Sequence, residues 1–213
     1  MDEPFDTAGH LGAMSRAVRD EGRDGRPGRT VVLERTFETA IEDLWDAITS
    51  AERIPRWFLP ISGDLRLGGR YQLEGHAGGE ITACDVPHHV AMTWEFNGDV
   101  SWVDVRLTEV DDGTHLVLEH AARVTPEWEE RGFGPGAVGI GWEMMLLGLA
   151  HHVPSGRAID PPEAMAWQSS EEAKAFMRVS SDAWCAADIA GGTPADVARA
   201  AADRTIEAYT ADG

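Results

Sequence analysis

The sequence predicts an α+β fold in which a curved antiparallel sheet wraps around one long helix, with a pair of helices after it. Between residues 63 and 122, alternating segments follow one another about every 8–12 residues, which indicates an antiparallel meander with one wet face. Residues 137–153 are apolar nearly all round, as in a helix buried over most of its surface. Beyond residue 170, two Ala-rich segments separated by Gly191-Gly192 predict an αα-hairpin.

The elements follow in chain order from a polar N-terminal extension. Residues 1–29 predict a helical turn or two and then a flexible, Gly-rich linker. A strand at 30–37 is rich in β-branched and aromatic residues. Thr39 and Glu42 form a capping box, so we expect a helix to begin at Thr39. Its buried stripe has helical spacing and consists of Ile41, Leu44, Trp45 and Ile48.

An aromatic segment, "ERIPRWFLP" at 52–60, follows this helix. Ser50 is expected to cap a second short helix there, which Pro55 keeps short or distorted. Trp57 and Phe58 then either plug the core or line and gate an apolar pocket. The residues themselves leave both interpretations open.

The meander is predicted from its turns and from alternation. We expect hairpin turns at 67–70 ("LGGR") and 77–80 ("AGGE"). Clean alternation predicts strands at 89–96, 102–110 and 115–121. Each strand has one apolar face, which should point toward the long helix.

The C-terminal part is predicted to be helical after a loop at 155–169. Helices are expected near 170–190 and 194–210, the second with Thr193 as N-cap and Pro194 at the first helical position.

The chain is thus predicted to have an N-terminal extension and linker (1–29), a sheet-and-helix domain (30–153) and a C-terminal helical extension (154–213). Trp184 and Tyr209 should anchor the last part on the domain or on a second copy. A lid role and a homodimer both stay open.

Composition excludes several classes of partner. The 213 residues carry 37 acidic and 18 Lys or Arg residues, a net charge of −19, which argues against nucleic acids and anionic membranes. The longest apolar run, 137–150, is too short to span a bilayer, and the N-terminus has no signal-like apolar region. Cys84 and Cys185 are expected to be free thiols. We therefore expect an acidic cytoplasmic protein without membrane insertion.

Five segments resemble a known family: 31–60, 65–75, 78–96, 114–121 and 139–153. They are similar to the family named for the activator of the heat-shock-protein-90 ATPase, within the START-like or SRPBCC superfamily. The resemblance implies the helix-grip fold, as in START-like and birch-pollen-allergen-like proteins. It also implies a hydrophobic cavity between the long helix and the concave sheet face, which takes an apolar or amphipathic small molecule. Ile41 departs from the family, which commonly has proline as the first helix begins.

Eight residues are candidates for lining that cavity, each with core packing as the alternative. They are Trp57, Phe58, Tyr71, Met92, Trp94, His120, Trp142 and Met145. His120 shares its strand face with two leucines, so its imidazole should be inward and hydrogen-bonded. Three roles are open for His120. In order of preference, it is a core histidine with its hydrogen bonds made, a polar anchor for a ligand, or a general acid or base.

Three charged residues are candidates for polar groups in the cavity: Arg35, Glu80 and Glu143. Arg35 has inward strand parity and would need an acidic partner, which Glu80 or Glu143 could supply. Glu143 either reaches the edge of the long helix, which we slightly favour, or enters the cavity.

No metal, cofactor or catalytic residue is predicted. The pairs His88-His89 and His151-His152 consist of adjacent residues whose side chains point apart, and no HExxH or CxxC motif is present. The Gly-rich stretch at 132–139 lacks the preceding strand and the lysine of a phosphate-binding loop.

The leading hypothesis is binding of a small hydrophobic or amphipathic ligand without chemistry. The enzyme alternative is a cyclase- or hydratase-like protein that uses His120, Arg35 or Glu143 as its polar group. The third hypothesis, a co-chaperone-like interaction module, has no motif in this sequence to support it, so we expect no chaperone partner.

Overall fold

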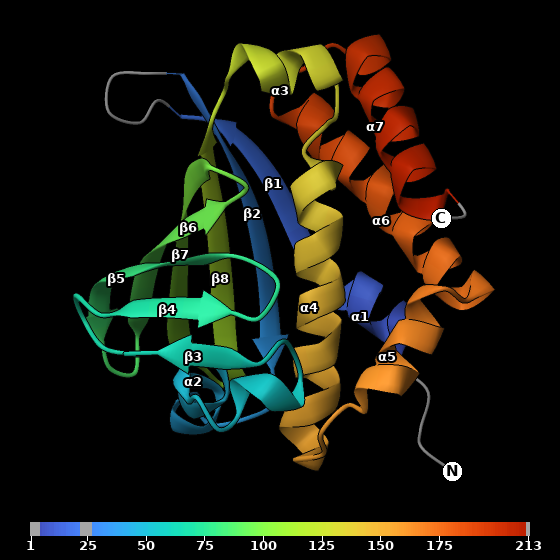
Figure 1. Cartoon of the computed structure of the whole chain (residues 1–213). Helices are drawn as coiled ribbons and strands as arrows, with labels where there is room; N and C mark the ends of the chain where they lie inside the picture. The colour runs from blue at the N-terminus through green and yellow to red at the C-terminus, as the bar shows by residue number, and fades with distance from the viewer. Residues whose placement is uncertain (1–4, 22–26, 212–213) are drawn as a thin grey trace. The chain divides into compact units, whose positions relative to one another are not determined.

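A computed structural model describes residues 5–21 and 27–211 of the chain (Figure 1). The strands are β1 (Ser15–Asp20), β2 (Gly28–Phe37), β3 (Ile61–Gly63), β4 (Arg70–Leu73), β5 (Gly78–Asp85), β6 (His89–Phe96), β7 (Asp99–Val110) and β8 (Gly113–Arg123). The helices are α1 (Thr7–Ala13), α2 (Ile41–Thr49), the 3-10 helix η1 (Ile54–Arg56), α3 (Pro126–Arg131), α4 (Gly136–Ser155), α5 (Pro161–Gln168), α6 (Glu171–Ala190) and α7 (Ala195–Thr210).

The eight strands form one sheet with the order β1-β2-β8-β7-β6-β5-β4-β3. From β3 to β8, each strand pairs antiparallel with the next one along the chain, as the alternation predicts. Helices α6 and α7 lie side by side and form the predicted αα-hairpin (Figure 1). The α+β helix-grip fold with a C-terminal αα-hairpin is confirmed.

Contacts between residues that are close in space divide the chain into two compact units. Unit 1 comprises Met1–Leu33, Arg123–Leu147 and Asp160–Gly213. Unit 2 comprises Glu34–Ala122 and Gly148–Ile159. The N-terminal and C-terminal segments therefore belong to one unit, while most of the antiparallel sheet belongs to the other. The division of the chain into 1–29, 30–153 and 154–213 stays a prediction.

A buried carboxylate connects three elements of unit 1. Glu143 of α4 is 0% exposed, and its two oxygens each accept a hydrogen bond of 2.7 Å from Arg16 of β1. The indole of Trp184 on α6 donates a third bond of 2.6 Å. A carboxylate without water is tolerated only when it is paired and hydrogen-bonded, so these partners are what allow its burial. The expectation that Glu143 reaches the edge of the helix is wrong.

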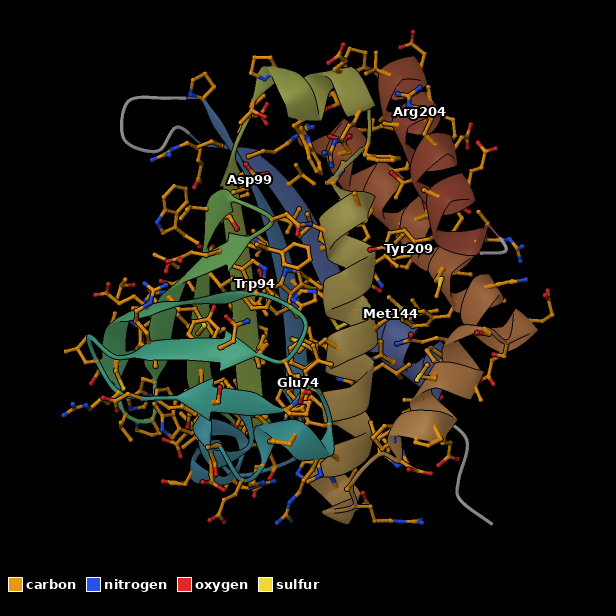
Figure 2. The ribbon with its side chains drawn as sticks, in the orientation of Figure 1. Glu74, Trp94, Asp99, Met144, Arg204 and Tyr209 are labelled. Atoms are coloured by element: carbon orange, nitrogen blue, oxygen red, sulfur yellow. The ribbon has the colours of Figure 1, made fainter. Side chains whose placement is uncertain are left out.

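Close packing of α4 in unit 1 requires a glycine. A Cβ at Gly139 would lie 2.1 Å from a ring carbon of Trp184, so only glycine lets the backbone of α4 approach this buried indole. On α7, Tyr209 points toward α4 (Figure 2) and donates a hydrogen bond of 3.0 Å to the carbonyl of Ala137. The two anchors proposed from the sequence for the C-terminal helices thus both contact α4.

In unit 2, polar contacts fix the segment that follows α2. Arg53 bonds the carboxylate of Asp43 at 2.6 Å and lies 3.3 Å from Nε2 of His152, in the last turns of α4. A Cβ at Gly148 would lie 2.5 Å from the carbonyl oxygen of Trp57, so the end of α4 passes directly beside this backbone. These contacts hold η1 and the aromatic residues after it in place.

Three expectations about local structure are corrected. The helical turns expected from residue 10 onward are present only as far as the end of α1 at Ala13. Residues 15–20 form β1 instead, because pairing with β2 in the sheet overrides local preference. The expected loop at 155–169 contains α5, which begins with prolines where a helix tolerates them. The expected turn at 77–80 is the start of β5, and the chain reverses at 74–76, where Gly75 has a φ of 66°.

Three predicted helix caps also differ. Ser50 does not cap the short helix after α2, because the N-cap of η1 is Arg53. Thr39 does not cap α2; its hydroxyl bonds the carboxylate of Asp43 at 2.9 Å. Thr193 donates to the carboxylate of Asp188 at 2.6 Å, and Pro194 is the N-cap of α7. The hydroxyls of Thr39 and Thr193 each bind a carboxylate, which forms a stronger hydrogen bond than a neutral acceptor does.

Candidate functional site

One face of the sheet in unit 2 carries most of the residues predicted to bind a ligand. One row across four neighbouring strands consists of Ile81, Met92, Val103 and His120. In the next row, Trp94 lies opposite Ser101, and Tyr71 lies opposite Gly79 (Figure 2 labels Trp94). The strand register therefore gathers an imidazole, an indole, a phenol and a thioether on one face.

Tyr71 occupies the space that a glycine leaves between β4 and β6. A Cβ at Gly79 would lie 2.0 Å from the carbonyl oxygen of Thr93, so no side chain fits at this position of β5. The Tyr71 hydroxyl reaches across β5 and donates a hydrogen bond of 2.8 Å to that same oxygen. Burial raises the pKa of Tyr71 well above its usual range, so the phenol stays neutral.

His120 belongs to a short hydrogen-bond relay. Its Nε2 lies 2.7 Å from the hydroxyl of Ser101, and that hydroxyl donates to the carbonyl of Trp94 at 3.2 Å. A hydroxyl has one proton and a carbonyl can only accept, so with both bonds made Nε2 of His120 carries the proton. Nδ1 is then the nitrogen without a proton, which makes it an acceptor.

The environment of His120 keeps the imidazole uncharged. The residue is 8% exposed, and burial lowers its pKa to about 4. At neutral pH the side chain is therefore a neutral polar group on an apolar face. Its ring centroid lies 6.0 Å from that of Trp94, so it borders the aromatic surface directly.

Trp57 and Phe58, which the sequence left between core and pocket, lie in different environments. Trp57 is 8% exposed, and its indole donates a hydrogen bond of 2.9 Å to the carbonyl of Ala47 in α2. Phe58 is half-buried and stacks on Trp57 with ring centroids 5.9 Å apart. The packing of Trp57 is that of a core residue, whereas Phe58 keeps part of its ring uncovered.

Two aromatic side chains that border the site were not singled out by the sequence. The ring of His76 lies 5.6 Å from that of Trp94 and 6.4 Å from that of Phe58. Phe96, at the end of β6, stacks on His76 with ring centroids 4.7 Å apart. The alternation of β6 placed Phe96 on the apolar face, but the wrongly expected turn at 77–80 hid the position of His76.

The remaining candidates lie elsewhere. Arg35 is half-buried, with its guanidinium 5.0 Å from the ring centre of Phe37. Glu80 is exposed on β5. Trp142 is buried and Met145 is half-buried. Both lie on the part of α4 that belongs to unit 1, which also carries the ion-paired Glu143.

Within the described ranges, no group of three or more His, Cys, Asp or Glu residues is arranged to hold a metal ion. None of the helices in that part of the chain is long and apolar enough to cross a membrane.

Residues 38–153 match the sequence pattern of one protein family, described as "Activator of Hsp90 ATPase homolog 1-like protein". The match covers more than half of the chain. The chain belongs to this family. Within the Hsp90-activator-like family, the matched segment includes every strand from β3 to β8 and most of α4. None of the curated proteins compared with the chain matches it.

This chain is similar to two solved structures of CalU16 from Micromonospora echinospora, over almost the whole length of CalU16. The crystal structure has 31% identity and a TM-score of 0.65, and the match covers 82% of this chain and 98% of CalU16. The solution NMR structure has 32% identity and a TM-score of 0.68, with 84% and 97% covered. A match of this length extends beyond residues 38–153. CalU16 therefore also resembles part of the segments that lie before or after these residues.

A second protein of known structure, MLL2253 from Mesorhizobium loti, is similar in fold. It has 23% identity and a TM-score of 0.53, and the match covers 62% of this chain and all of MLL2253 at 100%. The family and the CalU16 structures together give this chain an SRPBCC-type helix-grip fold.

Proposed function

We propose that this protein binds a small hydrophobic or amphipathic molecule against the aromatic face of the sheet in unit 2. The observation that carries the proposal is incomplete burial. Phe58, Met92 and Trp94 stay half-buried, although Val90 and Val103 on the same face are buried. Protein interiors are packed without gaps, so apolar side chains left uncovered on an inner face favour a binding surface.

The polar groups of this face favour an uncharged ligand. His120 and Tyr71 are both neutral at pH 7, so they offer hydrogen bonds without a counter-charge. The net charge of −19 adds a long-range repulsion of anions. A mostly apolar molecule with a few neutral polar atoms fits both features.

Binding is favoured over cyclase- or hydratase-like catalysis by the state of His120. A general base works best when its pKa lies near the working pH, and a pKa of about 4 makes this imidazole a weak base at neutral pH. The hydroxyl of Ser101 donates its hydrogen bond to the backbone carbonyl of Trp94 and not to a base, so it is not activated as a nucleophile.

A pair of tryptophan variants tests the proposal. Trp94→Ala should weaken binding of the neutral dye N-phenyl-1-naphthylamine about tenfold or more, because it removes the largest of the half-buried apolar side chains, which are Phe58, Met92 and Trp94. Trp57→Ala should lower the free energy of unfolding by about 3–5 kcal/mol and leave dye affinity unchanged in the protein that still folds. Fluorescence titration and urea unfolding measure the two effects.

The two variants can be compared directly, because each replaces one tryptophan by alanine and so removes a side chain of the same size. If Trp94→Ala binds the dye as well as wild type, the aromatic face is not the binding surface. If Trp57→Ala loses affinity with little loss of stability, Trp57 is a wall of the pocket, and the core interpretation of its packing is overturned.

A further inference from the structure

His76 is the centre of a cluster of rings from three separate segments of unit 2. It lies in the turn between β4 and β5, two residues after Glu74, which Figure 2 labels. Phe96 at the end of β6 stacks on it, with an angle of 16° between the two ring planes. Phe58 after η1 and Trp94 within β6 approach it edge-on, each at 67°. One imidazole thus joins the aromatic residues of the candidate site to the tip of the β6–β7 hairpin.

The cluster forms a continuous path from the interior to the surface. Trp57 is buried, Phe58 and Trp94 are half-buried, and His76 and Phe96 are exposed, Phe96 by 40%. Each ring contacts the next one at a centroid distance between 4.7 and 6.4 Å. The exposed His76–Phe96 stack thus forms the outer end of the half-buried apolar surface, on the side from which a ligand would come from solvent.

The turn that carries His76 is short and is held by local hydrogen bonds. The side-chain amide of Gln72 donates to the carbonyls of Leu73 and His76, at 2.7 and 2.9 Å. Gly75 supplies the left-handed backbone with a φ of 66°. The Glu74 amide also donates a hydrogen bond of 2.9 Å to the carbonyl of Pro60, so the backbone of the turn is fixed. The side chains of His76 and Phe96 are exposed, and rotation of these two side chains is enough to open their stack.

We propose that the His76–Phe96 stack is the closed gate of the ligand site, and that a ligand enters and leaves by displacing it. This inference rests on the proposed ligand binding. A gate controls the rates of association and dissociation together. It leaves the affinity nearly constant, because it stands in the way of the ligand without holding it.

Stopped-flow fluorescence with N-phenyl-1-naphthylamine tests the gate on the full chain. His76→Ala and Phe96→Ala should each raise the association and dissociation rate constants by a similar factor of about ten, with the dissociation constant changed by less than about threefold. His76→Phe keeps a stacking ring and should keep the wild-type rates. His88→Ala removes an exposed histidine from the turn at the other end of β5 and is the matched control.

The outcomes distinguish the gate from the site itself. If wild-type protein shows no saturable dye binding, the proposed function is overturned and the gate with it. If binding is normal and both alanine variants keep wild-type rates, the gate alone is overturned. A weaker affinity with an unchanged association rate also contradicts it, because His76 would then be a wall of the site. If one of the two alanine variants fails to fold, the other still tests the gate, because removal of either ring opens the stack.

Discussion

Replacing Glu143 by alanine should lower the free energy of unfolding by about 3–5 kcal/mol, measured by urea unfolding at pH 7. The carboxylate is fully buried and holds Arg16 of β1 and Trp184 of α6. Its removal leaves the guanidinium of Arg16, whose side chain is only 10% exposed, without its counter-charge. The cost comes mainly from this uncompensated buried cation.

Glu95→Ala is the matched control for this prediction. Glu95 pairs with Arg70 at the same distance of 2.7 Å, but on the surface, with side chains 37% and 62% exposed. Solvent screens such a pair, so this variant should change stability little. Similar losses in the two variants would show that burial does not set the strength of the Arg16–Glu143 pair.

Lowering the pH should destabilise the protein through His120. Burial lowers the pKa of the folded histidine to about 4, while the unfolded histidine keeps the ordinary value of about 6.5. Between these values the unfolded state binds the extra proton, so stability falls as the pH falls from about 6.5 to about 4. The loss should be about 2 kcal/mol between pH 7 and pH 5 and about 3 kcal/mol by pH 4.

The contribution of His120 is isolated by comparing wild type with His120→Gln. The amide of glutamine can still donate to Ser101 but does not titrate in this range. Every other group titrates in both proteins, so the difference between their urea-unfolding profiles belongs to His120. Parallel profiles from pH 7 to pH 4 would contradict a desolvated imidazole at this position.

Much of the sheet could be predicted because its signal is local. The period-two alternation of residues 89–96 gave the bounds of β6 and the side on which Met92 and Trp94 lie. The same argument placed His120 on the buried face of β8. The opposite case is β1, which is polar and forms a strand only because it pairs with β2, a contact that no local pattern records.

The features that were missed, in the site and outside it, depend on contacts between distant residues. Ser101 faces Trp94 only in the register of β6 and β7, and the hydroxyl itself has no special neighbours in the sequence. His76 was hidden by a turn placed three residues too far along the chain. The partners of Glu143 come from opposite ends of the sequence, so its burial could not be foreseen from the helix alone.

The central claim is that a small apolar molecule binds on the aromatic face of unit 2. Native mass spectrometry of the purified full chain tests it most directly, with Trp94→Ala measured beside wild type. The account predicts a retained small-molecule mass on wild-type protein, or one acquired from added N-phenyl-1-naphthylamine, that is much reduced on Trp94→Ala. Only the bare polypeptide mass under both conditions, or equal occupancy of the two proteins, would contradict it.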